Sequence, residues 1–237
     1  MVKDLKNAGL VSSSQTDIHP RLLEITHKHL VHRWKQPLHQ PTVDAWLRLK
    51  NEQGFSARDG FILDSGCGTG ASSIQLAELN PGCIVLGVDQ SISRLTTNGV
   101  LDGFYRSNNL ILMRAELSSL WRLMLAEGYQ PDCHYLLYPN PWPKSSHVKR
   151  RWHGHPVFPD LLSLGGALEL RCNWEIYAQE FAAAAGQLCK SNFAVKVFSG
   201  AANSTPFEQK YLARGQALFV VNIPASATQA FAKHRSV

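Results

Sequence analysis

The chain has 237 residues, of which 44% are hydrophobic. This length fits one α/β domain and the apolar fraction is enough for a buried core, which excludes fibrous proteins and disorder along the whole chain. The 24 Lys and Arg residues outnumber the 18 Asp and Glu residues, and the resulting net charge of +6 permits a polyanionic partner without requiring one.

The cysteines and the apolar segments indicate where the protein works. Five cysteines occur without a Cys-x-x-Cys pair, a pattern typical of a reduced cytosolic protein. The N-terminus lacks the apolar region of a signal peptide, and no apolar run reaches the roughly 18 residues that span a membrane. The histidines lack the spacing of metal ligands. We therefore expect a cytoplasmic protein without a membrane partner or a metal site.

The first part of the chain differs from the rest in composition. Residues 1–17 are polar and are expected to form a loose arm. Residues 19–39 carry five of the ten histidines and an excess of three positive charges, and their apolar residues recur with a helical period. We expect an amphipathic surface helix there; a basic lip for nucleic acid, tipped by Trp34, is the alternative. The predicted domains are an N-terminal basic, His-rich arm with helices over residues 1–55 and a second domain over residues 56–237.

Short apolar runs alternate with helical stretches from residue 60 onward. Parallel strands covered on both faces read as continuous apolar runs, and their alternation with helices is typical of βαβ units. We therefore predict a Rossmann-like α/β fold, in which a largely parallel, seven-stranded sheet has helices on both faces. The predicted strands are residues 61–63, 83–88, 110–113, 134–138, 167–170, 193–198 and 218–223, and the clearest helices are residues 71–79 and 176–188.

A glycine-rich loop follows the first predicted strand, and residues 64–70 read Asp-Ser-Gly-Cys-Gly-Thr-Gly. Ligands bind at this end of the first strand in open α/β sheets, and glycines let the backbone approach a ligand closely. Gly66 and Gly68 also fit a dinucleotide-binding loop, so a nicotinamide-dependent oxidoreductase is an alternative. Asp64 and Gly70 favour S-adenosylmethionine, because the loop then resembles the D-x-G-C-G-T-G motif of class I methyltransferases. We expect these four residues to bind the cofactor.

Acidic residues follow the second and third predicted strands. Asp89 is placed to accept hydrogen bonds from both hydroxyls of a ribose, with Gln90 beside it; capping of a helix is the alternative for Asp89. Ala115 and Glu116 follow the third strand, where class I methyltransferases commonly hold the adenine amino group. The alternative for Glu116 is a first-turn glutamate on a helix that begins near residue 117. We expect all four residues to contact the cofactor.

A proline-rich motif follows the fourth predicted strand and reads Tyr-Pro-Asn-Pro-Trp-Pro-Lys over residues 138–144. Its prolines stiffen the backbone, so that Asn140 and Trp142 are held where they can orient an acceptor base. Trp142 offers a stacking face to that base. No acidic residue occurs between Asp132 and Asp160, which predicts a phosphate-binding loop, with a solvated basic turn as the alternative. The basic residues of this loop are Lys144, Lys149, Arg150 and Arg151.

This motif resembles that of bacterial tRNA (guanine-N7)-methyltransferases of the TrmB type, which reads F-P-D-P-W-x-K-x-x-H-x-K-R-R. Residues 139–144 and 147–151 match it at the same spacing. Residues 173–177, Asn-Trp-Glu-Ile-Tyr, resemble the family's T-D-W-x-x-Y motif, and residues 205–208, Thr-Pro-Phe-Glu, resemble its T-x-[FY]-E motif. The resemblance covers about residues 60–223.

The resemblance implies a class I methyltransferase fold and an enzyme that transfers a methyl group from S-adenosylmethionine to N7 of a guanine. It implies tRNA or another structured RNA as the partner. By the same resemblance, Asn140 stands at the active site as the catalytic residue. The residues implied to bind the acceptor guanosine are Lys144, Asn173, Thr205 and Glu208.

The chain is a divergent member by this resemblance, because Asn140 and Asn173 stand where the family has aspartates. Guanine N7 carries a lone pair and needs no general base, so positioning and stabilisation of the product cation suffice for its methylation. A neutral amide stabilises that cation less, and it both donates and accepts hydrogen bonds. The alternatives are a methyltransferase for an amino group or another ring nitrogen, and a non-catalytic relative that binds RNA or cofactor. We expect a monomer.

Overall fold

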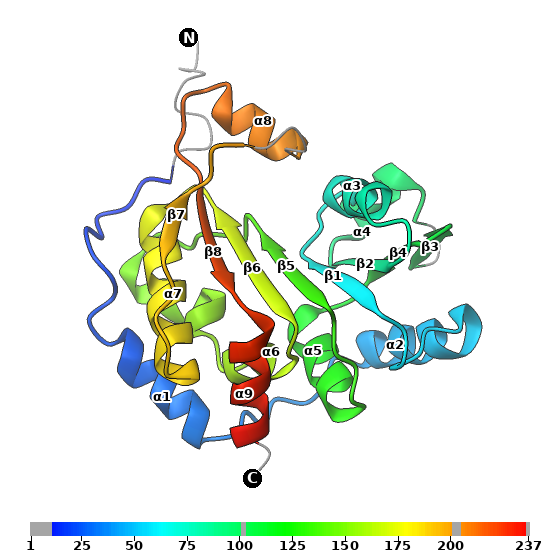
Figure 1. Ribbon diagram of the computed structural model, residues 1–237, viewed down its shortest axis with the longest axis horizontal. Helices are drawn as coiled ribbons and strands as arrows, with labels where there is room; N and C mark the ends of the chain where they lie inside the picture. The colour runs from blue at the N-terminus through cyan, green and yellow to red at the C-terminus, as the bar shows by residue number, and fades with distance from the viewer. Residues whose placement is uncertain (1–10, 101–102, 201–204, 236–237) are drawn as a thin grey trace.

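The computed structural model describes residues 11–100, 103–200 and 205–235, so residues 1–10 of the predicted arm lie outside the described residues. A mixed sheet runs through the centre of the molecule (Figure 1). Its strands in these ranges are β1 (Phe61–Ser65), β2 (Ile84–Asp89), β3 (Phe104–Ser107), β4 (Leu110–Arg114), β5 (Cys133–Leu137), β6 (Ala167–Cys172), β7 (Val195–Val197) and β8 (Phe219–Ile223).

The strands lie across the sheet in the order β3-β4-β2-β1-β5-β6-β8-β7. The four pairs from β4 to β6 are parallel, whereas β3 and β8 run antiparallel to their neighbours. The seven predicted strands are therefore confirmed, as is the largely parallel sheet. The predicted number was wrong by one, because β3 pairs with β4 as an additional edge strand. A turn at Asn108, whose φ is 48°, joins these two strands, and asparagine tolerates this left-handed conformation better than most residues.

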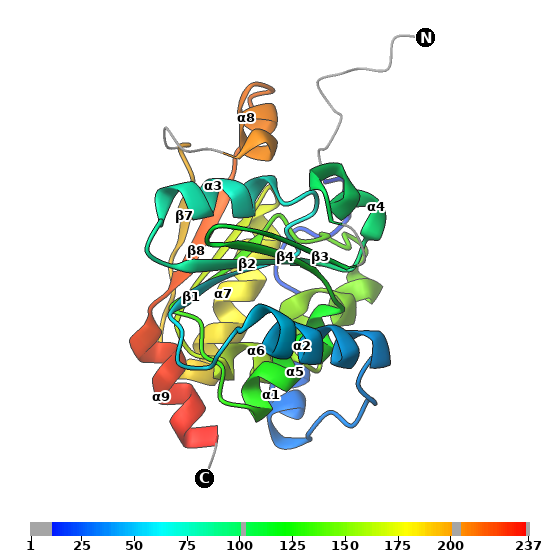
Figure 2. The ribbon, with the colours of Figure 1, turned by 90° about the vertical axis from the view of Figure 1, so that its right-hand side faces the viewer.

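Helices cover both faces of the sheet, as predicted. Helices α3 and α4 pack on one face against β2 and β4, and α2, α5, α7 and α9 belong to the larger core on the other face (Figure 2). Along the described ranges, no helix combines the length and the apolar character that crossing a bilayer demands. The helices are α1 (Leu22–Val31), α2 (Gln40–Gln53), α3 (Ala71–Leu79), α4 (Ile92–Leu95), α5 (Leu117–Ala126), α6 (Phe158–Ser163), α7 (Glu175–Cys189), α8 (Pro206–Leu212) and α9 (Ala225–Arg235), with 3-10 turns η1 (Thr96–Asn98), η2 (Ser145–Arg150) and η3 (Trp152–Gly154).

The N-terminal helices share the core of the sheet. The amphipathic helix predicted within residues 19–39 is α1, which is shorter and ends at Val31. Leu22 of α1 and Trp46 of α2 are fully buried in the same hydrophobic cluster as residues of β1, β2 and β5. The division of the chain at residue 55 stays a prediction, and this shared core is the contact through which the two predicted parts meet.

Trp34 is not the free tip of a basic lip. The side chain is half-buried, and its ring meets the ring of His155 edge-on with 4.9 Å between their centroids. The Arg122 guanidinium lies over the same ring at 5.2 Å. Trp34 therefore fastens the segment between α1 and α2 to the body of the protein.

A glycine in β2 allows α3 to approach the sheet closely. A Cβ atom at Gly87 would lie 2.2 Å from Ser73 Oγ and 2.7 Å from Leu112 Cδ2. Both neighbours are fully buried, so they have little room to move away. Ser73 also belongs to the helix that follows the glycine-rich loop, so this packing fixes the position of that loop relative to the sheet.

We expect the substitution Gly87→Ala to lower the free energy of unfolding by about 1–3 kcal/mol, because the added methyl overpacks the contact between α3 and β2. Urea denaturation measures this difference. Gly82→Ala is the matched control, since a Cβ atom there would have nothing within 4 Å. Equal stabilities of the two variants would contradict the packing argument.

Candidate functional site

Two cavities open at the end of the sheet where the parallel strands finish, which is the edge at which ligands bind in open α/β sheets. Each has a volume of about 570 Å³. The first, here called the glycine-loop cavity, is lined among others by Gly66, Gly68, Tyr138, Asn140, Asn173 and Thr205. The second, here called the α2 cavity, is lined among others by His39, Thr42, Gln90, Phe104, Ala115 and Glu116.

The glycine-rich loop forms one wall of the glycine-loop cavity. Gly66 and Gly68 have φ values of 83° and 61°, which glycine adopts without strain. A Cβ atom at Gly68 would meet nothing within 4 Å, so the backbone there borders open space. A Cβ atom at Gly70 would lie 2.7 Å from Leu112 Cδ1, and the contact of Gly70 with a cofactor stays a prediction. A glycine is thus required at this position by packing against β4, and Gly70 is the N-cap of α3 and is not one of the residues that line the cavity.

Asp64 lies fully buried at the end of β1, beneath the glycine-rich loop. Its Oδ2 accepts hydrogen bonds from Ser72 Oγ at 2.5 Å and from Ser73 Oγ at 2.7 Å. Its Oδ1 is buried without a hydrogen-bond partner. Burial raises the pKa of Asp64, which the two serine hydroxyls partly offset. A buried carboxylate oxygen without a partner is costly, so this position favours a ligand that supplies a donor or a positive charge.

Asp89 lies between the two cavities. Its carboxylate contacts Gly68, which lines the glycine-loop cavity, and the next residue in the chain, Gln90, lines the α2 cavity. Only 5% of Asp89 is exposed. Its Oδ2 accepts a hydrogen bond from the Gly68 backbone N–H at 3.0 Å, and its Oδ1 accepts one from the Ser91 N–H at 2.8 Å. Asp89 therefore holds the loop in place, and the Arg94 guanidinium also lies 3.9 Å from its Oδ2. The contact of Asp89 with a ribose stays a prediction.

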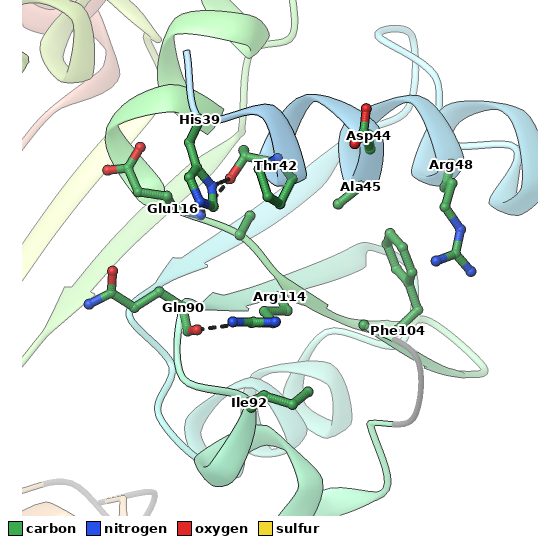
Figure 3. Close-up of a pocket in the computed structure, with 13 residues that line it drawn as sticks. His39, Thr42, Asp44, Ala45, Arg48, Gln90, Ile92, Phe104, Arg114 and Glu116 are labelled. Atoms are coloured by element: carbon green, nitrogen blue, oxygen red, sulfur yellow. Dashed lines mark hydrogen bonds between the residues drawn. The ribbon is translucent and has the colours of Figure 1, made fainter. Parts of the chain in front are cut away.

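The α2 cavity lies between α2 and the ends of β2 and β4, with side chains from both sides turned toward it (Figure 3). Gln90, Ala115 and Glu116 all line this cavity, and their predicted contact with a cofactor stays a prediction. The Glu116 side chain caps α5 by accepting hydrogen bonds from the backbone N–H groups of Ser118 and Ser119. Burial acts to raise the pKa of Glu116, but these hydrogen bonds outweigh it and lower the pKa. Glu116 thus serves the helix that begins at Leu117, as the alternative expects, although it is the N-cap and not a first-turn residue. Its contact with a cofactor stays a prediction.

Sequence reasoning missed the part of this cavity that α2 supplies. Thr42 Oγ1 accepts a hydrogen bond from the Glu116 backbone N–H at 2.8 Å, and His39 Nδ1 lies 3.0 Å from the same hydroxyl. The Arg48 guanidinium stacks over the Phe104 ring at 5.1 Å. None of these residues belongs to a motif. Only a prediction that α2 packs across the end of β4 could have found them.

The proline-rich motif bends sharply after β5. Tyr138 and Trp142 have φ values of 53° and 45°, a left-handed conformation that is strained for residues other than glycine. Asn140, between them, is exposed and lines the glycine-loop cavity. The Arg150 guanidinium lies over the Trp142 ring at 4.8 Å. The motif therefore turns its amide toward the cavity and presents an aromatic and a cationic group beside it.

The four basic residues of this loop have two different environments. Lys144, Lys149 and Arg150 are exposed and stay candidates for phosphate contacts. Arg151 is fully buried and forms an ion pair with Glu180, which is also fully buried. The Arg151 guanidinium donates to Glu180, to Gln15 and to the carbonyl oxygens of the same loop, so it is engaged inside the protein and the structure corrects the prediction for Arg151.

The structure also corrects the prediction for Glu208, whose side chain is completely buried. Its carboxylate accepts hydrogen bonds from Thr205 N–H at 2.6 Å, from Tyr138 Oη at 2.9 Å and from Arg171 Nη1 at 2.9 Å. Thr205 Oγ1 in turn accepts a hydrogen bond from the Glu208 N–H, which completes a capping box at the start of α8. Glu208 thus supports the cavity wall from behind, whereas Thr205 lines the cavity. Asn173 also lines it, and its binding of the acceptor stays a prediction.

Two aromatic residues of α8 line the glycine-loop cavity and were not predicted. Phe207 is 48% exposed, and its ring meets the Tyr211 ring edge-on at 4.8 Å between centroids. The Tyr138 ring lies 5.5 Å from Phe207. Burial and the Glu208 carboxylate both raise the pKa of Tyr138, so its phenol remains protonated and donates to Glu208. The sequence offered one signal for these residues, which is the aromatic Phe207 within the Thr205-to-Glu208 motif.

In the described ranges, no group of three or more His, Cys, Asp or Glu side chains could hold a metal ion.

Comparison with known proteins identifies a family and a fold. A family model described as "Putative methyltransferase" matches residues 59–221. The tRNA (guanine-N(7)-)-methyltransferase of Chromobacterium violaceum is 32% identical over 130 residues, which are 54% of this chain and 57% of that protein. The protein of the same name from Neisseria gonorrhoeae is 30% identical over 122 residues, which are 50% of this chain and 51% of that protein. The matches thus span about half the length of these curated relatives.

Among solved structures, the crystal structure of the 16S rRNA methyltransferase KamB aligns with a TM-score of 0.50. The alignment covers 80% of this chain and 95% of that chain at 15% identity. At this identity the likeness establishes the fold alone, and it confirms the predicted class I methyltransferase fold.

Proposed function

The chain belongs to the methyltransferase family whose model covers residues 59–221, and from this premise we propose that it transfers a methyl group from S-adenosylmethionine to tRNA, at N7 of a guanine. The observation that carries the proposal is one cavity lined by both the glycine-rich loop and Asn140 of the proline-rich motif. Such a cavity brings a cofactor methyl group and an acceptor atom together. A tRNA substrate also places the reaction in the cytoplasm, and we propose a monomeric enzyme.

The residues present fit S-adenosylmethionine, which supplies a methyl group on a positively charged sulfur. The unpartnered Oδ1 of Asp64 suits the cationic amino-acid end of the cofactor. Gly68 leaves open space along the loop, Gly66 adopts the positive φ of 83° that turns it, and Asp89 keeps lone pairs for the ribose hydroxyls. Gln90, Ala115 and Glu116 line the adjoining α2 cavity, which suits the adenine.

The acceptor side of the proposal rests on positioning. Guanine N7 has its own lone pair, so the chain has to align the base rather than remove a proton. Asn140 and Asn173 line the cavity with amides that donate and accept hydrogen bonds, and we assign Asn140 the role of orienting the base edge. Phe207 offers an exposed ring to stack on the same base.

The RNA backbone would bind beside the cavity. Lys144, Lys149 and Arg150 are exposed on one turn that follows Asn140, and Arg150 covers the Trp142 ring. Cationic side chains of this kind neutralise phosphates and make RNA binding dependent on salt. Trp142 and Arg150 together form the surface that a nucleotide next to the acceptor would meet.

Incubation with methyl-labelled S-adenosylmethionine and tRNA that lacks 7-methylguanosine tests the proposal. Digestion of the tRNA to nucleosides is expected to release labelled 7-methylguanosine. Binding of S-adenosylhomocysteine without transfer to any RNA would contradict enzymatic function and support the non-catalytic alternative.

One observation favours a second acceptor. Asn140 and Asn173 place neutral amides in the cavity at the two positions where the motifs that the sequence resembles have aspartates. An amide pairs well with an edge that has both a donor and an acceptor, such as that of adenine. Labelled methyladenosine in the same digest, without labelled 7-methylguanosine, would identify this alternative.

A further inference from the structure

A buried ionic cluster lies directly behind the proline-rich motif. It consists of Arg151, His153 and Glu180, and the side chains of all three have no exposed surface. Glu180 Oε2 pairs with the Arg151 guanidinium and with His153 Nε2, which lies 2.8 Å away. Removing charged groups from water costs several kcal/mol per ion, which offsets the attraction between the paired groups. Stabilisation of the fold therefore does not by itself explain such a cluster. Its contacts with the motif indicate what else it does.

Arg151 holds the backbone of the motif at its strained residue. Its Nε and Nη2 donate to the Trp142 carbonyl oxygen at 3.2 Å and 3.1 Å, and Nη2 also donates to the Lys144 carbonyl oxygen at 3.3 Å. Trp142 has the left-handed φ of 45°, and such a conformation persists only where the surroundings enforce it. The rigid fork of a guanidinium suits this task better than the single charge of an ammonium group.

The N-terminal segment completes the cluster from the far end of the sequence. Gln15 Oε1 accepts a hydrogen bond from Arg151 Nη2 at 3.0 Å, and Gln15 Nε2 donates to Glu180 Oε1 at 2.6 Å. The His19 backbone N–H donates to the same Glu180 oxygen at 2.9 Å. Ser13 Oγ donates to the Pro143 carbonyl oxygen at 2.6 Å, so this segment also contacts the motif directly.

We propose that Arg151, Glu180 and Gln15 are positioning residues for methyl transfer, which set the backbone of residues 139–144 and thereby aim Asn140 at the acceptor base. Two adjacent arginines then have separate tasks: Arg150 faces the RNA, and Arg151 shapes the loop from inside. The N-terminal segment is part of the acceptor site, although its sequence carries no catalytic motif. The inference rests on the proposed function for its catalytic consequence.

The substitution Gln15→Ala is the first test, because it leaves the Arg151–Glu180 ion pair intact. We expect kcat for tRNA methylation to fall by about tenfold or more, since small displacements of aligned groups have large effects on rate. The KM for S-adenosylmethionine and the affinity for tRNA are expected to stay within about twofold. Gln36→Ala, at an exposed position between α1 and α2, is the matched control and is expected to leave all three unchanged.

Hydrogen–deuterium exchange supplies a readout that does not depend on activity. Gln15→Ala is expected to speed exchange in the peptides that cover residues 139–150 while peptides from β1 and β2 stay protected. The exchange measurement keeps this proposal separate from the proposed function. If the wild-type protein methylates no RNA, the proposed function fails. The exchange data then still decide whether Gln15 orders the motif. Unchanged exchange in residues 139–150 would overturn the positioning role.

The salt dependence of RNA binding tests the division of tasks between the arginines. The double substitution Arg151→Gln with Glu180→Gln keeps the net charge, and we expect it to lower kcat without changing the slope of log binding constant against log salt. Lys149→Ala is expected to reduce that slope by about 1, as loss of one phosphate contact does. A similar reduction in the double variant would make Arg151 a phosphate ligand and overturn the proposal.

Discussion

Replacing Asn140 by alanine is expected to lower kcat for tRNA methylation by about 100-fold, while the affinity for S-adenosylhomocysteine remains that of the wild type. The estimate follows from the 10²–10³-fold effect of removing one hydrogen-bonding group that acts in a transition state. Asn140 is exposed, so its truncation leaves no buried polar partner and no core cavity. The loss should therefore appear in the rate and not in the free energy of unfolding.

Asn140→Asp is the informative companion to the alanine variant. A carboxylate at this position would stabilise the cation formed when guanine N7 is methylated, so we expect it to raise transfer to guanine by about tenfold, or 1.4 kcal/mol. Single-turnover measurements with labelled cofactor separate this effect from product release. If Asn140→Asp instead lowers the rate of transfer to guanine, and the wild-type protein methylates adenine, the second acceptor would be favoured.

The substitution Asp89→Ala is expected to weaken cofactor binding by about 100-fold, because hydrogen bonds to a charged group contribute about 1.5–3 kcal/mol each. Two effects combine here. The ribose loses its acceptors, and the Gly68 N–H loses the carboxylate that fixes the loop. Isothermal titration with S-adenosylhomocysteine measures the change.

Two further variants give that measurement its controls. Asp89→Asn keeps one acceptor oxygen, so we expect a smaller loss of about tenfold. Asp132→Ala removes an exposed carboxylate at the start of β5, which is the opposite end of the sheet, and is expected to bind cofactor normally. Normal affinity in Asp89→Ala would remove Asp89 from the cofactor site and leave it only the role of holding the loop.

The fold was readable from the sequence because buried parallel strands leave an unmistakable pattern. Residues 84–88 and 110–113 are apolar on both faces, and the loops between strands carry glycine or proline where the chain turns. The short edge strand β3 was missed because its residues are partly exposed and mixed in polarity. The helix α2 was not singled out for the same reason, since only one of its faces is buried and its contacts come from distant strands.

Cavity-lining residues could be predicted only where they directly follow a strand of the sheet. Asn140, Asn173 and Gln90 line the cavities because parallel strands bring their carboxyl ends together. Arg151 and Glu208 were misassigned because the sequence does not reveal the buried partner that engages each of them. An arginine beside two other cations reads as a phosphate ligand until Glu180, 29 residues later, is found next to it.

The Glu208 carboxylate has a consequence for how the protein is made. Tyr138, Arg171 and Thr205 all hydrogen-bond to this one side chain, so the wall of the glycine-loop cavity is assembled from three segments that are far apart along the chain. The strand β8, which lies between β6 and β7 in the sheet, is also synthesised after both of them. A nascent chain that has left the ribosome only as far as β6 already contains the glycine-rich loop and Asn140, yet it still lacks the wall that makes them into one cavity. The cavity is thus completed late in synthesis, when the residues that follow β6 close long-range contacts that are slow to form.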